Sequence, residues 1–271
     1  MIIDCHLHFP VVKNRDFKKA KEKLLGDLRK NKISYAIVIP DSLHYSAIPD
    51  VDTSLDLLKK EKKLFLMGTL DILRDKTPLI PKLDQIFQAE KIVGIKIFPG
   101  HEPHYPTDKR LIPAYKLCIK YDLPLVIHTG WNSNCPEVAK YNDPKYIVKI
   151  AREYPKLKII IAHYFWPEVE YCYKITRGYK NVYFDTSGLA DKEVVENTGL
   201  RRIKNILEKT INDNPESVVF GTDYGMCTFK DHISLINSLK ISREKKQMIF
   251  YENAIKLFKL KIDTPPGEEW A

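Results

Sequence analysis

The sequence predicts a single-domain (β/α)8 barrel, or TIM barrel, over residues 1–271. Eight short apolar runs alternate with segments of helical periodicity, and buried strands that are joined by helices run parallel. A chain of 271 residues suits one such barrel, and no stretch is biased enough to act as a linker. The alternative, an open doubly wound sheet, calls for a Gly-rich phosphate turn after the first strand, and the sequence has none there.

The expected strands are apolar runs that end at a proline, a glycine or a polar residue. They lie at residues 1–8, 35–39, 64–70, 93–98, 123–128, 157–163, 181–185 and 217–223. The expected helices fill the intervals, and the first places Phe17, Ala20, Leu24, Leu25 and Leu28 on one face. They lie at residues 16–30, 53–62, 79–89, 112–121, 144–154, 168–176, 191–210, 231–239 and 243–258.

The net charge of +9 comes mostly from lysine-rich helical segments in which acids are interleaved, as in residues 18–23. This pattern is typical of solvated helix faces, so we expect a small-molecule substrate and no nucleic-acid partner. No apolar run approaches the roughly 20 residues that span a bilayer, so no membrane association is expected. Whether the chain forms a homo-oligomer stays open.

The five cysteines are Cys5, Cys118, Cys135, Cys172 and Cys227, an odd number scattered without CxxC spacing. They indicate reduced thiols rather than a disulfide framework or a zinc cage. The chain also starts directly in an apolar strand, without an export signal. We therefore expect a cytoplasmic protein.

The opening strand carries a His-x-His pair, His6 and His8. Side chains alternate along a strand, so Asp4, His6 and His8 are expected on one face and Cys5 and Leu7 on the other. Two imidazoles that point into one space are a natural pair of divalent-metal ligands. Taken alone, however, a His-x-His pair is more often two core or turn histidines bonded to backbone groups, so the metal interpretation depends on ligands from elsewhere in the chain.

Nearly every expected strand ends in one ionisable side chain. These residues are His6 and His8, Asp71, Lys96, His128, His163, Asp185 and Asp223. The C-terminal ends of barrel strands open onto one face, where barrel enzymes carry their chemistry. The sequence therefore predicts that residues far apart along the chain meet in one bowl.

The chain resembles the amidohydrolase superfamily, in particular the group that includes aminocarboxymuconate-semialdehyde decarboxylase. The resemblance lies in IDCHLH at 3–8, GIKIFP at 94–99, LPLVIHTG at 123–130, LKIIIAH at 157–163, NVYFDTS at 181–187, FGTDY at 220–224 and ENAIKLF at 252–258. These motifs follow the order of the family over nearly the whole chain. The resemblance implies a metal-dependent barrel enzyme, and it says little about the substrate.

By this resemblance, His6, His8, His128 and Asp223 are metal ligands. His163 is either a ligand of a second metal or the residue that polarises substrate or water. Three imidazoles and one carboxylate with an open position also describe a catalytic zinc, which lowers the pKa of water toward ~7. We thus expect one or two divalent ions, with zinc favoured, and Asp223 as the catalytic proton carrier. The structural alternatives are a turn cap for Asp223 and core histidines for His128 and His163.

Lys96 has two interpretations. It would bridge two metals as a carboxylated lysine, as in some members of the superfamily, or it would pair as an ammonium with Asp71 or another carboxylate, since a buried charge needs a partner. Asp4 is expected to support the ligands or to make a polar contact at the barrel end. Asp185 and Ser187 would orient ligands or form a polar turn.

Several loop residues are candidates for a substrate pocket that takes an aromatic or carboxylated molecule. They are His101, His104, Arg110, Trp131, Tyr164, Phe165 and Trp166. Pro103 lies inside the His101–His104 segment and excludes the helical zinc motif HExxH.

These observations lead to a first hypothesis: hydrolysis of a C–N or C–O acyl bond by metal-activated water, with His163 stabilising the oxyanion. The alternative is non-oxidative decarboxylation or hydration of an aromatic or unsaturated carboxylic acid. A TatD-like nuclease ranks lower, because that resemblance calls for a glutamate where this chain has Lys96. A barrel that holds metal without catalysis ranks lower too, because structural sites rarely gather ligands from four strands.

Overall fold

The computed structural model describes residues 1–42, 45–73, 81, 84, 85, 87, 91–131 and 136–262. The helix expected at 79–89 falls mostly outside the described residues, and Cys135 lies outside them as well. Cys5, Cys118, Cys172 and Cys227 are free thiols, as expected. No helix of the described part is long and apolar enough to cross a membrane.

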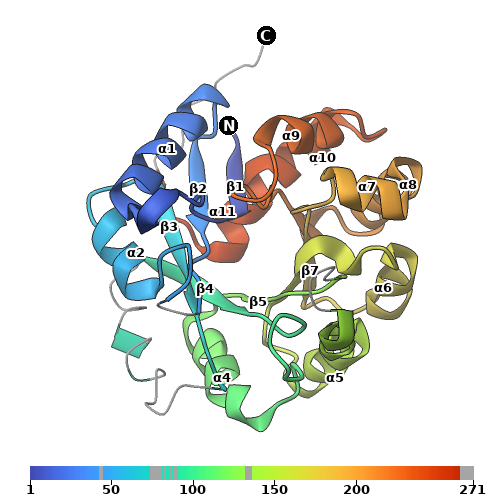
Figure 1. Cartoon of the computed structure of the whole chain (residues 1–271). Coiled ribbons are helices and arrows are strands. Elements are labelled where there is room, and N and C mark those ends of the chain that lie inside the picture. Colours follow the sequence, from blue (N-terminus) through green and yellow to red (C-terminus); the bar gives the residue numbers. More distant parts are fainter. Residues whose placement is uncertain are drawn as a thin grey trace.

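Eight parallel strands form a nearly closed barrel and follow one another in chain order (Figure 1). They are β1 (Ile3–Leu7), β2 (Tyr35–Val38), β3 (Leu64–Thr69), β4 (Ile92–Ile97), β5 (Leu125–Ile127), β6 (Ile159–Ile161), β7 (Val182–Asp185) and β8 (Val218–Val219). Two backbone bonds close the ring between β1 and the segment of β8: Cys5 N donates to Phe220 O at 2.8 Å, and His8 N donates to Tyr224 O at 2.7 Å. The predicted (β/α)8 barrel is thus confirmed.

The helices surround the strands as a ring (Figure 1). They are α1 (Phe17–Lys30), α2 (Val51–Leu58), α4 (Ile112–Tyr121), α5 (Pro144–Glu153), α6 (Val169–Thr176), α7 (Lys192–Thr198), α8 (Leu200–Asp213), α9 (Phe229–Asn237), α10 (Arg243–Gln247) and α11 (Asn253–Phe258), with a π-helical turn at Met248–Glu252 between the last two. Side-chain caps start many of them; Asp16, Asp50 and Asp143 accept backbone N–H groups at the first turns of α1, α2 and α5.

One predicted helix is wrong. The interval 191–210 holds two helices, because Gly199 between α7 and α8 takes a φ of 88°, which is outside the helical region. The apolar periodicity continues across this break, so the pattern alone indicates one helix.

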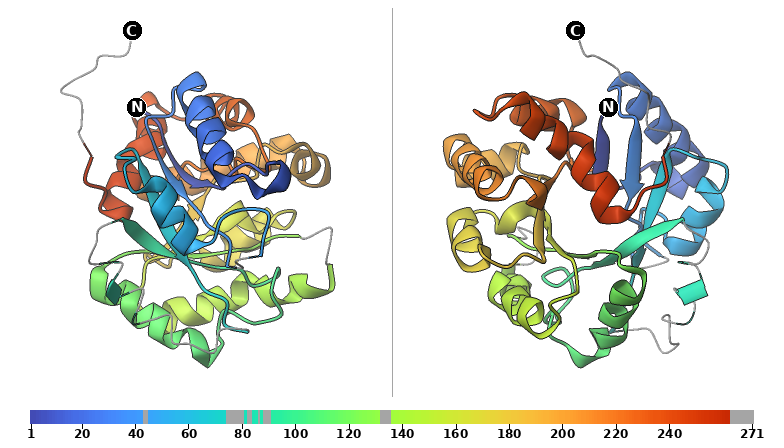
Figure 2. Two further views of the ribbon diagram at one scale, coloured as in Figure 1. Left: turned by 60° about the vertical axis from the view of Figure 1, so that its left-hand side comes forward. Right: turned by 180° about the vertical axis from the view of Figure 1, so that it is seen from behind.

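The core has two parts. The outer cluster fills the space between the strands and the surrounding helices, with Leu66, Ile95 and Ile161 as examples. The inner cluster lies within the barrel and takes alternate strand residues such as Ile37 and Val126. Leu257 and Phe258 of α11 join this inner cluster, and the view from behind shows the C-terminal helix lying across the end of the barrel (Figure 2). One end of the barrel is therefore closed by apolar packing, and the chemistry belongs at the opposite end.

Two β-bulges turn site residues toward the barrel interior. The β1–β2 register shifts between Asp4 and Leu7, and the β3–β4 register shifts so that β4 gains one residue before Lys96. Cys5 consequently belongs to the inner cluster and Leu7 to the outer one, so the expectation that they share a face is wrong. Bulges next to active sites commonly re-aim a side chain in this way.

Asp4 links the bulged part of β1 to the segment after β8 through hydrogen bonds. Its buried carboxylate accepts the backbone N–H of His6 at 3.0 Å, the backbone N–H of Thr222 at 3.1 Å and the Thr222 hydroxyl at 2.5 Å. Burial raises the pKa of Asp4 to about 7, although these hydrogen bonds act in the opposite direction. Asp4 therefore links β1 to the chain after β8, the two segments that carry the ligand candidates His6, His8 and Asp223.

We expect Asp4→Ala to lower the free energy of unfolding by about 2–4 kcal/mol, because it leaves buried donors of His6 and Thr222 without an acceptor. Urea unfolding of the metal-free protein measures this change. Ser54→Ala is the control, since the Ser54 hydroxyl is buried without a hydrogen-bond partner in the described structure and its loss should change the free energy far less. Equal stability of Asp4→Ala and the wild type would contradict this role for Asp4.

Candidate active site

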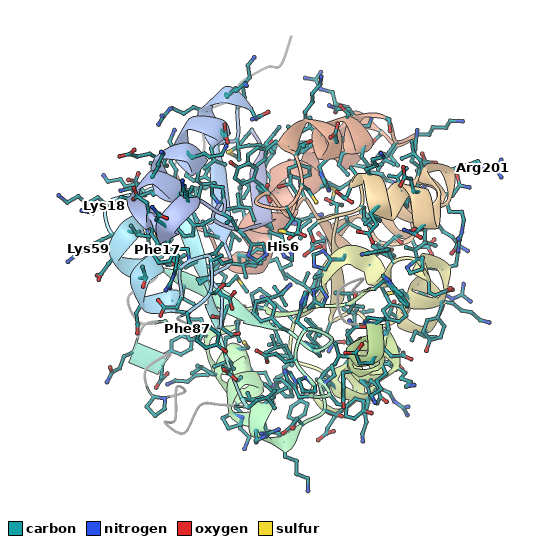
Figure 3. The ribbon with its side chains drawn as sticks, in the orientation of Figure 1. His6, Phe17, Lys18, Lys59, Phe87 and Arg201 are labelled. Carbon is teal, nitrogen blue, oxygen red and sulfur yellow. The ribbon has the colours of Figure 1, made fainter. Side chains whose placement is uncertain are left out.

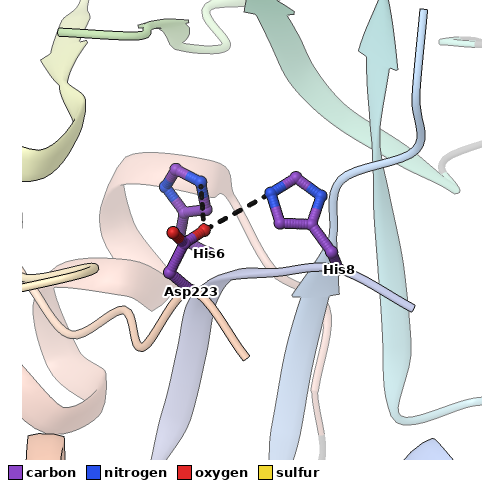
Figure 4. Close-up of side chains that lie close together, drawn as sticks. All are labelled: His6, His8 and Asp223. Atoms are coloured by element: carbon purple, nitrogen blue, oxygen red, sulfur yellow. Dashed lines mark ion pairs between the residues drawn. The ribbon is translucent and has the colours of Figure 1, made fainter. Parts of the chain in front are cut away.

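His6, His8 and Asp223 come together at the C-terminal end of β1. In the side-chain view, His6 lies inside the ring of helices, while Lys18, Lys59 and Arg201 point away at its edge (Figure 3). The Asp223 carboxylate lies 3.5 Å from His6 Nε2 and 3.4 Å from His8 Nε2 (Figure 4). One ligand atom from each residue lies within 4.8 Å of the other two, a spacing that suits a shared metal ion.

The other ring nitrogen of each imidazole is already engaged. His6 Nδ1 bonds Asp185 Oδ2 at 2.7 Å, and His8 Nδ1 bonds the Ile39 carbonyl at 2.9 Å. A carbonyl only accepts, so His8 donates from Nδ1 and keeps a lone pair on Nε2. His6 Nε2 is buried without a hydrogen-bond partner in the described structure. This combination of engaged Nδ1 and free Nε2 is the usual arrangement of a metal-binding histidine, so the donors fit a divalent ion.

The backbone at Asp223 is held in an uncommon conformation. Its φ is 62°, in the left-handed region that non-glycine residues rarely adopt. Its N–H donates to the His6 carbonyl at 2.7 Å, and Gly221 lies so near β1 that an added Cβ would stand 2.9 Å from His6 Cβ. Strained backbone of this kind clusters at functional sites.

A second group of side chains adjoins the first. His163, which follows β6, has its ring centroid 4.8 Å from that of His6 and 4.9 Å from that of His128, which follows β5. His128 Nε2 is buried without a partner in the described structure, and His163 Nδ1 lies 2.9 Å from the Ser187 hydroxyl and 3.2 Å from the Ser187 carbonyl. The ligand atoms of His6, His163 and Asp185 also lie within 4.8 Å of one another.

The turn that carries His163 is left-handed, with φ of 61°, 56° and 54° at His163, Tyr164 and Phe165. Thr129 stabilises it, because its hydroxyl donates to the Ala162 carbonyl at 2.5 Å and accepts from Phe165 N at 2.9 Å. The same turn directs the buried Tyr164 side chain away from the bowl. Its ring stacks on Phe184 with ring centroids 4.4 Å apart, and its hydroxyl bonds the Thr210 hydroxyl. His163 therefore points into the bowl and Tyr164 packs among the helices.

The charges of the bowl suit metal ligation. Burial lowers the pKa of His6, His128 and His163, to about 3 for His163, so these imidazoles are neutral, as ligands must be. Burial alone would raise the pKa of Asp223, but the imidazoles of His163, His8 and His6 hold it well below its usual range. Asp223 is thus a carboxylate at neutral pH.

Lys96 is the buried cation of the bowl. Its side chain has no exposed surface, and its Nζ has no hydrogen-bond partner in the described structure. Burial lowers its pKa to about 8, while the carboxylates of Asp185 and Asp223 oppose that shift. The expected ion pair with Asp71 is not among the pairs within 4.0 Å that the described residues form.

Of the two loop histidines expected in the pocket, the structure brings one to the imidazole cluster. His101 is exposed, and its ring packs edge-on against His128 with centroids 4.2 Å apart. His104 is buried within its own loop, where Nε2 lies 3.0 Å from Glu102. The other oxygen of Glu102 accepts from the Ser42 hydroxyl at 3.0 Å, so His104 and Glu102 hold two loops of the rim together.

The remaining pocket candidates lie farther out. Arg110 is on the surface, with its guanidinium bonded to Asp108 at 2.7 Å and to the Ile72 carbonyl at 2.9 Å. Trp131 is 48% exposed, and its backbone N–H donates to the backbone carbonyl of Trp166. Trp166 is buried against Gly130. Trp131 and Trp166 therefore form one edge next to the loop of His128.

Three supporting residues were left unresolved or unnoticed by the sequence. Asp185 and Ser187 contact both His6 and His163, and the sequence signal was the polar end of the seventh strand. Thr222 was missed; it lies between Gly221 and Asp223 and bonds Asp4. Its only sequence signal is its place beside a ligand candidate.

Comparisons with known proteins identify the family of this chain. A family model described as amidohydrolase matches residues 3–260. No curated protein matches the chain significantly.

Among solved structures, similar folds occur in an uncharacterised TIM-barrel protein from Bordetella bronchiseptica (TM-score 0.75, 19% identity, covering 95% of this chain and 98% of that one) and a putative 2-pyrone-4,6-dicarboxylic acid hydrolase from Pseudomonas putida (0.71, 17%, 97% and 98%). A third is a 5-carboxyvanillate decarboxylase from Novosphingobium aromaticivorans, in complex with manganese (0.62, 16%, 96% and 96%). At these identities the likeness shows the fold. The family match over nearly the whole length shows that the chain belongs to the amidohydrolase family.

Proposed function

We propose that this protein is a metal-dependent enzyme that hydrolyses a C–N or C–O acyl bond of a small molecule. The observation that carries the proposal is the convergence of His6 Nε2, His8 Nε2 and the Asp223 carboxylate at the open end of the barrel. Their outward ring nitrogens are engaged by Asp185 and the Ile39 carbonyl, which leaves the lone pairs directed at one point.

In this proposal His6, His8, His128 and Asp223 hold the first divalent ion, for which zinc is our first choice. A second ion would use His163, and Lys96 would be a further ligand if it is carboxylated. As an ammonium, Lys96 would instead pair with a carboxylate of the bowl. A bound divalent ion supplies Lewis acidity that polarises a substrate oxygen and lowers the pKa of water. The contact of His163 Nδ1 with the Ser187 carbonyl supports a ligand or acceptor role for His163 Nε2 over the oxyanion-donor role.

Asp223 is the proposed proton carrier. It is ionised, 18% exposed and adjacent to His8, so it can accept a proton at the mouth and return it to a leaving group. His101, Trp131 and Trp166 are the proposed contacts for the substrate, since they border the loop of His128.

The second candidate is non-oxidative decarboxylation of an aromatic or unsaturated carboxylic acid. The buried Nζ of Lys96, which has no hydrogen-bond partner in the described structure, favours it, because an ammonium in that position could donate to a substrate carboxylate. Structural neighbours that are named decarboxylases add support at the level of the family.

The test is to load the purified protein with zinc or manganese and to assay a panel of lactones, amides and aromatic carboxylic acids. We expect hydrolysis of an acyl compound. A pH indicator follows lactones, which release a proton, and chromatography of the products follows amides, whose carboxylate and ammonium products leave the pH unchanged. Release of CO2 from an aromatic acid with no acyl hydrolysis would transfer the assignment to the decarboxylase. A protein that stays metal-free and inactive after reconstitution would refute both candidates.

A further inference from the structure

Asp185, the last residue of β7, makes four contacts with its buried carboxylate, and they divide unequally between its two oxygens. Oδ1 accepts the backbone N–H groups of His163 and Ser187, each at 3.1 Å, and the Ser187 hydroxyl at 2.5 Å. Oδ2 faces His6 Nδ1 at 2.7 Å. One oxygen is thus fixed by the backbone, and the other contacts the ring of a proposed ligand.

We infer that Asp185 is a positioning residue that determines which ring nitrogen of His6 carries the proton. A carboxylate only accepts hydrogen bonds, so the short contact requires the proton on His6 Nδ1 and leaves the lone pair on Nε2. Nε2 is the atom that faces Asp223. The part of the inference that concerns metal binding rests on the proposed function; the part that concerns the proton does not.

The unequal contacts make Asp185→Asn an unusually specific variant. Both backbone N–H groups at Oδ1 need an acceptor, so the amide oxygen of the asparagine must occupy that position. The amide NH2 group then faces His6 Nδ1 and donates to it. The Ser187 hydroxyl lies 3.1 Å from His6 Nδ1 and is the other acceptor within reach of a proton there. We expect the amide donor at the shorter 2.7 Å contact to prevail, so that His6 moves its proton to Nε2 and loses the lone pair that a metal needs, while the shape of the side chain at position 185 hardly changes.

Ser187 in turn determines which ring nitrogen of His163 carries the proton. Its hydroxyl donates to Asp185, so it accepts from His163 Nδ1, which lies 2.9 Å away. The Ser187 carbonyl at 3.2 Å is a second acceptor for the same nitrogen. The Asp185 carboxylate therefore orients the His6 ring directly and the His163 ring through Ser187. Both groups of side chains in the bowl depend on this one residue.

The experiment uses the metal-free protein with 15N-labelled histidine at about pH 8, above the ordinary imidazole pKa. Nitrogen chemical shifts distinguish the two neutral ring forms, and a His6→Asn variant assigns the signals of His6. We expect the Nδ1–H form of His6 in the wild type and the Nε2–H form in Asp185→Asn. Binding of zinc or manganese, measured by calorimetry, should weaken about 100-fold in Asp185→Asn.

Asp4→Asn is the matched control. Asp4 is equally buried and also uses one oxygen for backbone N–H groups, but its other oxygen faces the Thr222 hydroxyl, which rotates and accepts without any change of ring form. We expect His6 to keep its Nδ1–H form in this variant.

An Nε2–H form of His6 in the wild type would overturn the inference, even if Asp185→Asn fails to fold. An Nδ1–H form that persists in Asp185→Asn with unchanged metal affinity would overturn it as well. A switch of the ring form without any loss of metal affinity would support the positioning role and would instead contradict the proposed ligation by His6. The two failures are therefore distinguishable.

Discussion

The double variant His6→Ala/His8→Ala is expected to lose metal binding altogether. Both imidazoles present Nε2 to the Asp223 carboxylate, so the variant removes two of the three donors that lie within 4.8 Å of one another. The His128 imidazole and the Asp223 carboxylate that remain would hold a divalent ion weakly, because affinity at such sites comes from several donors in one geometry. Elemental analysis of the purified protein, before and after reconstitution with zinc or manganese, measures the loss.

The wild type should carry about one or two equivalents of metal per chain, and the variant none. His232→Ala is the control. His232 is also buried, but its Nδ1 bonds the Thr228 carbonyl and its Nε2 accepts from Ala190 N, so it already has two protein partners. This variant should keep the wild-type metal content. Equal metal in the wild type and in the double variant would place the metal elsewhere and contradict the assigned ligands.

The barrel was predictable from the sequence because its elements depend on local patterns. Apolar runs that are buried on both faces indicate parallel strands, and eight of them in alternation with helices indicate closure. Helix 112–121 coincides with α4, since Pro113 suits its first turn and Asp122, with a φ of 55°, ends it. The break at Gly199 is a local signal that the apolar periodicity hides: this glycine ends α7 with a φ of 88°, and its N–H donates to the Val195 carbonyl.

The candidate site was predictable by position and not by orientation. The places of His6, His8, His128, His163 and Asp223 at C-terminal strand ends predicted that they lie at one end of the barrel. The structure brings His6, His8 and Asp223 within 4.8 Å of one another, and it places His163 in ring contact with His6 and His128. The inward direction of the His6 and Lys96 side chains depends on the two β-bulges. These bulges are set by the register between neighbouring strands. The outward position of Arg110 likewise depends on Asp108 and the Ile72 carbonyl, which take its guanidinium hydrogen bonds.

The hydrogen bonds that hold the candidate ligands in place were the least predictable part of the site. The Asp4–Thr222 and Asp185–His6 contacts join residues separated by 218 and 179 positions. Such pairs exist only once the barrel has formed, and a single sequence carries no record of them. The sequence indicates only that a polar residue lies near a strand end. It does not indicate which residue this side chain will contact.

Asp223→Asn is expected to lower kcat by about 10²- to 10⁴-fold on whichever substrate the enzyme turns over, because an amide cannot accept and return the proton. The backbone should be unaffected: asparagine tolerates the left-handed φ of 62° that this position requires. The N–H of residue 223 would still donate to the His6 carbonyl. The variant therefore separates the proton-transfer role of the carboxylate from its structural surroundings.

Steady-state kinetics at saturating metal give kcat and KM separately, and a fall confined to kcat would locate the loss in the chemical step. Asp231→Asn is the matched control, since Asp231 lies in the first turn of α9, contacts the Thr228 hydroxyl and is exposed. Its kcat should stay close to that of the wild type. Unchanged turnover in Asp223→Asn would refute the proton-carrier role. Metal content of the same variant separates the two roles proposed for this carboxylate. Retained metal with a loss of kcat alone would assign proton transfer to Asp223, and loss of the metal would show that the carboxylate is needed as a ligand.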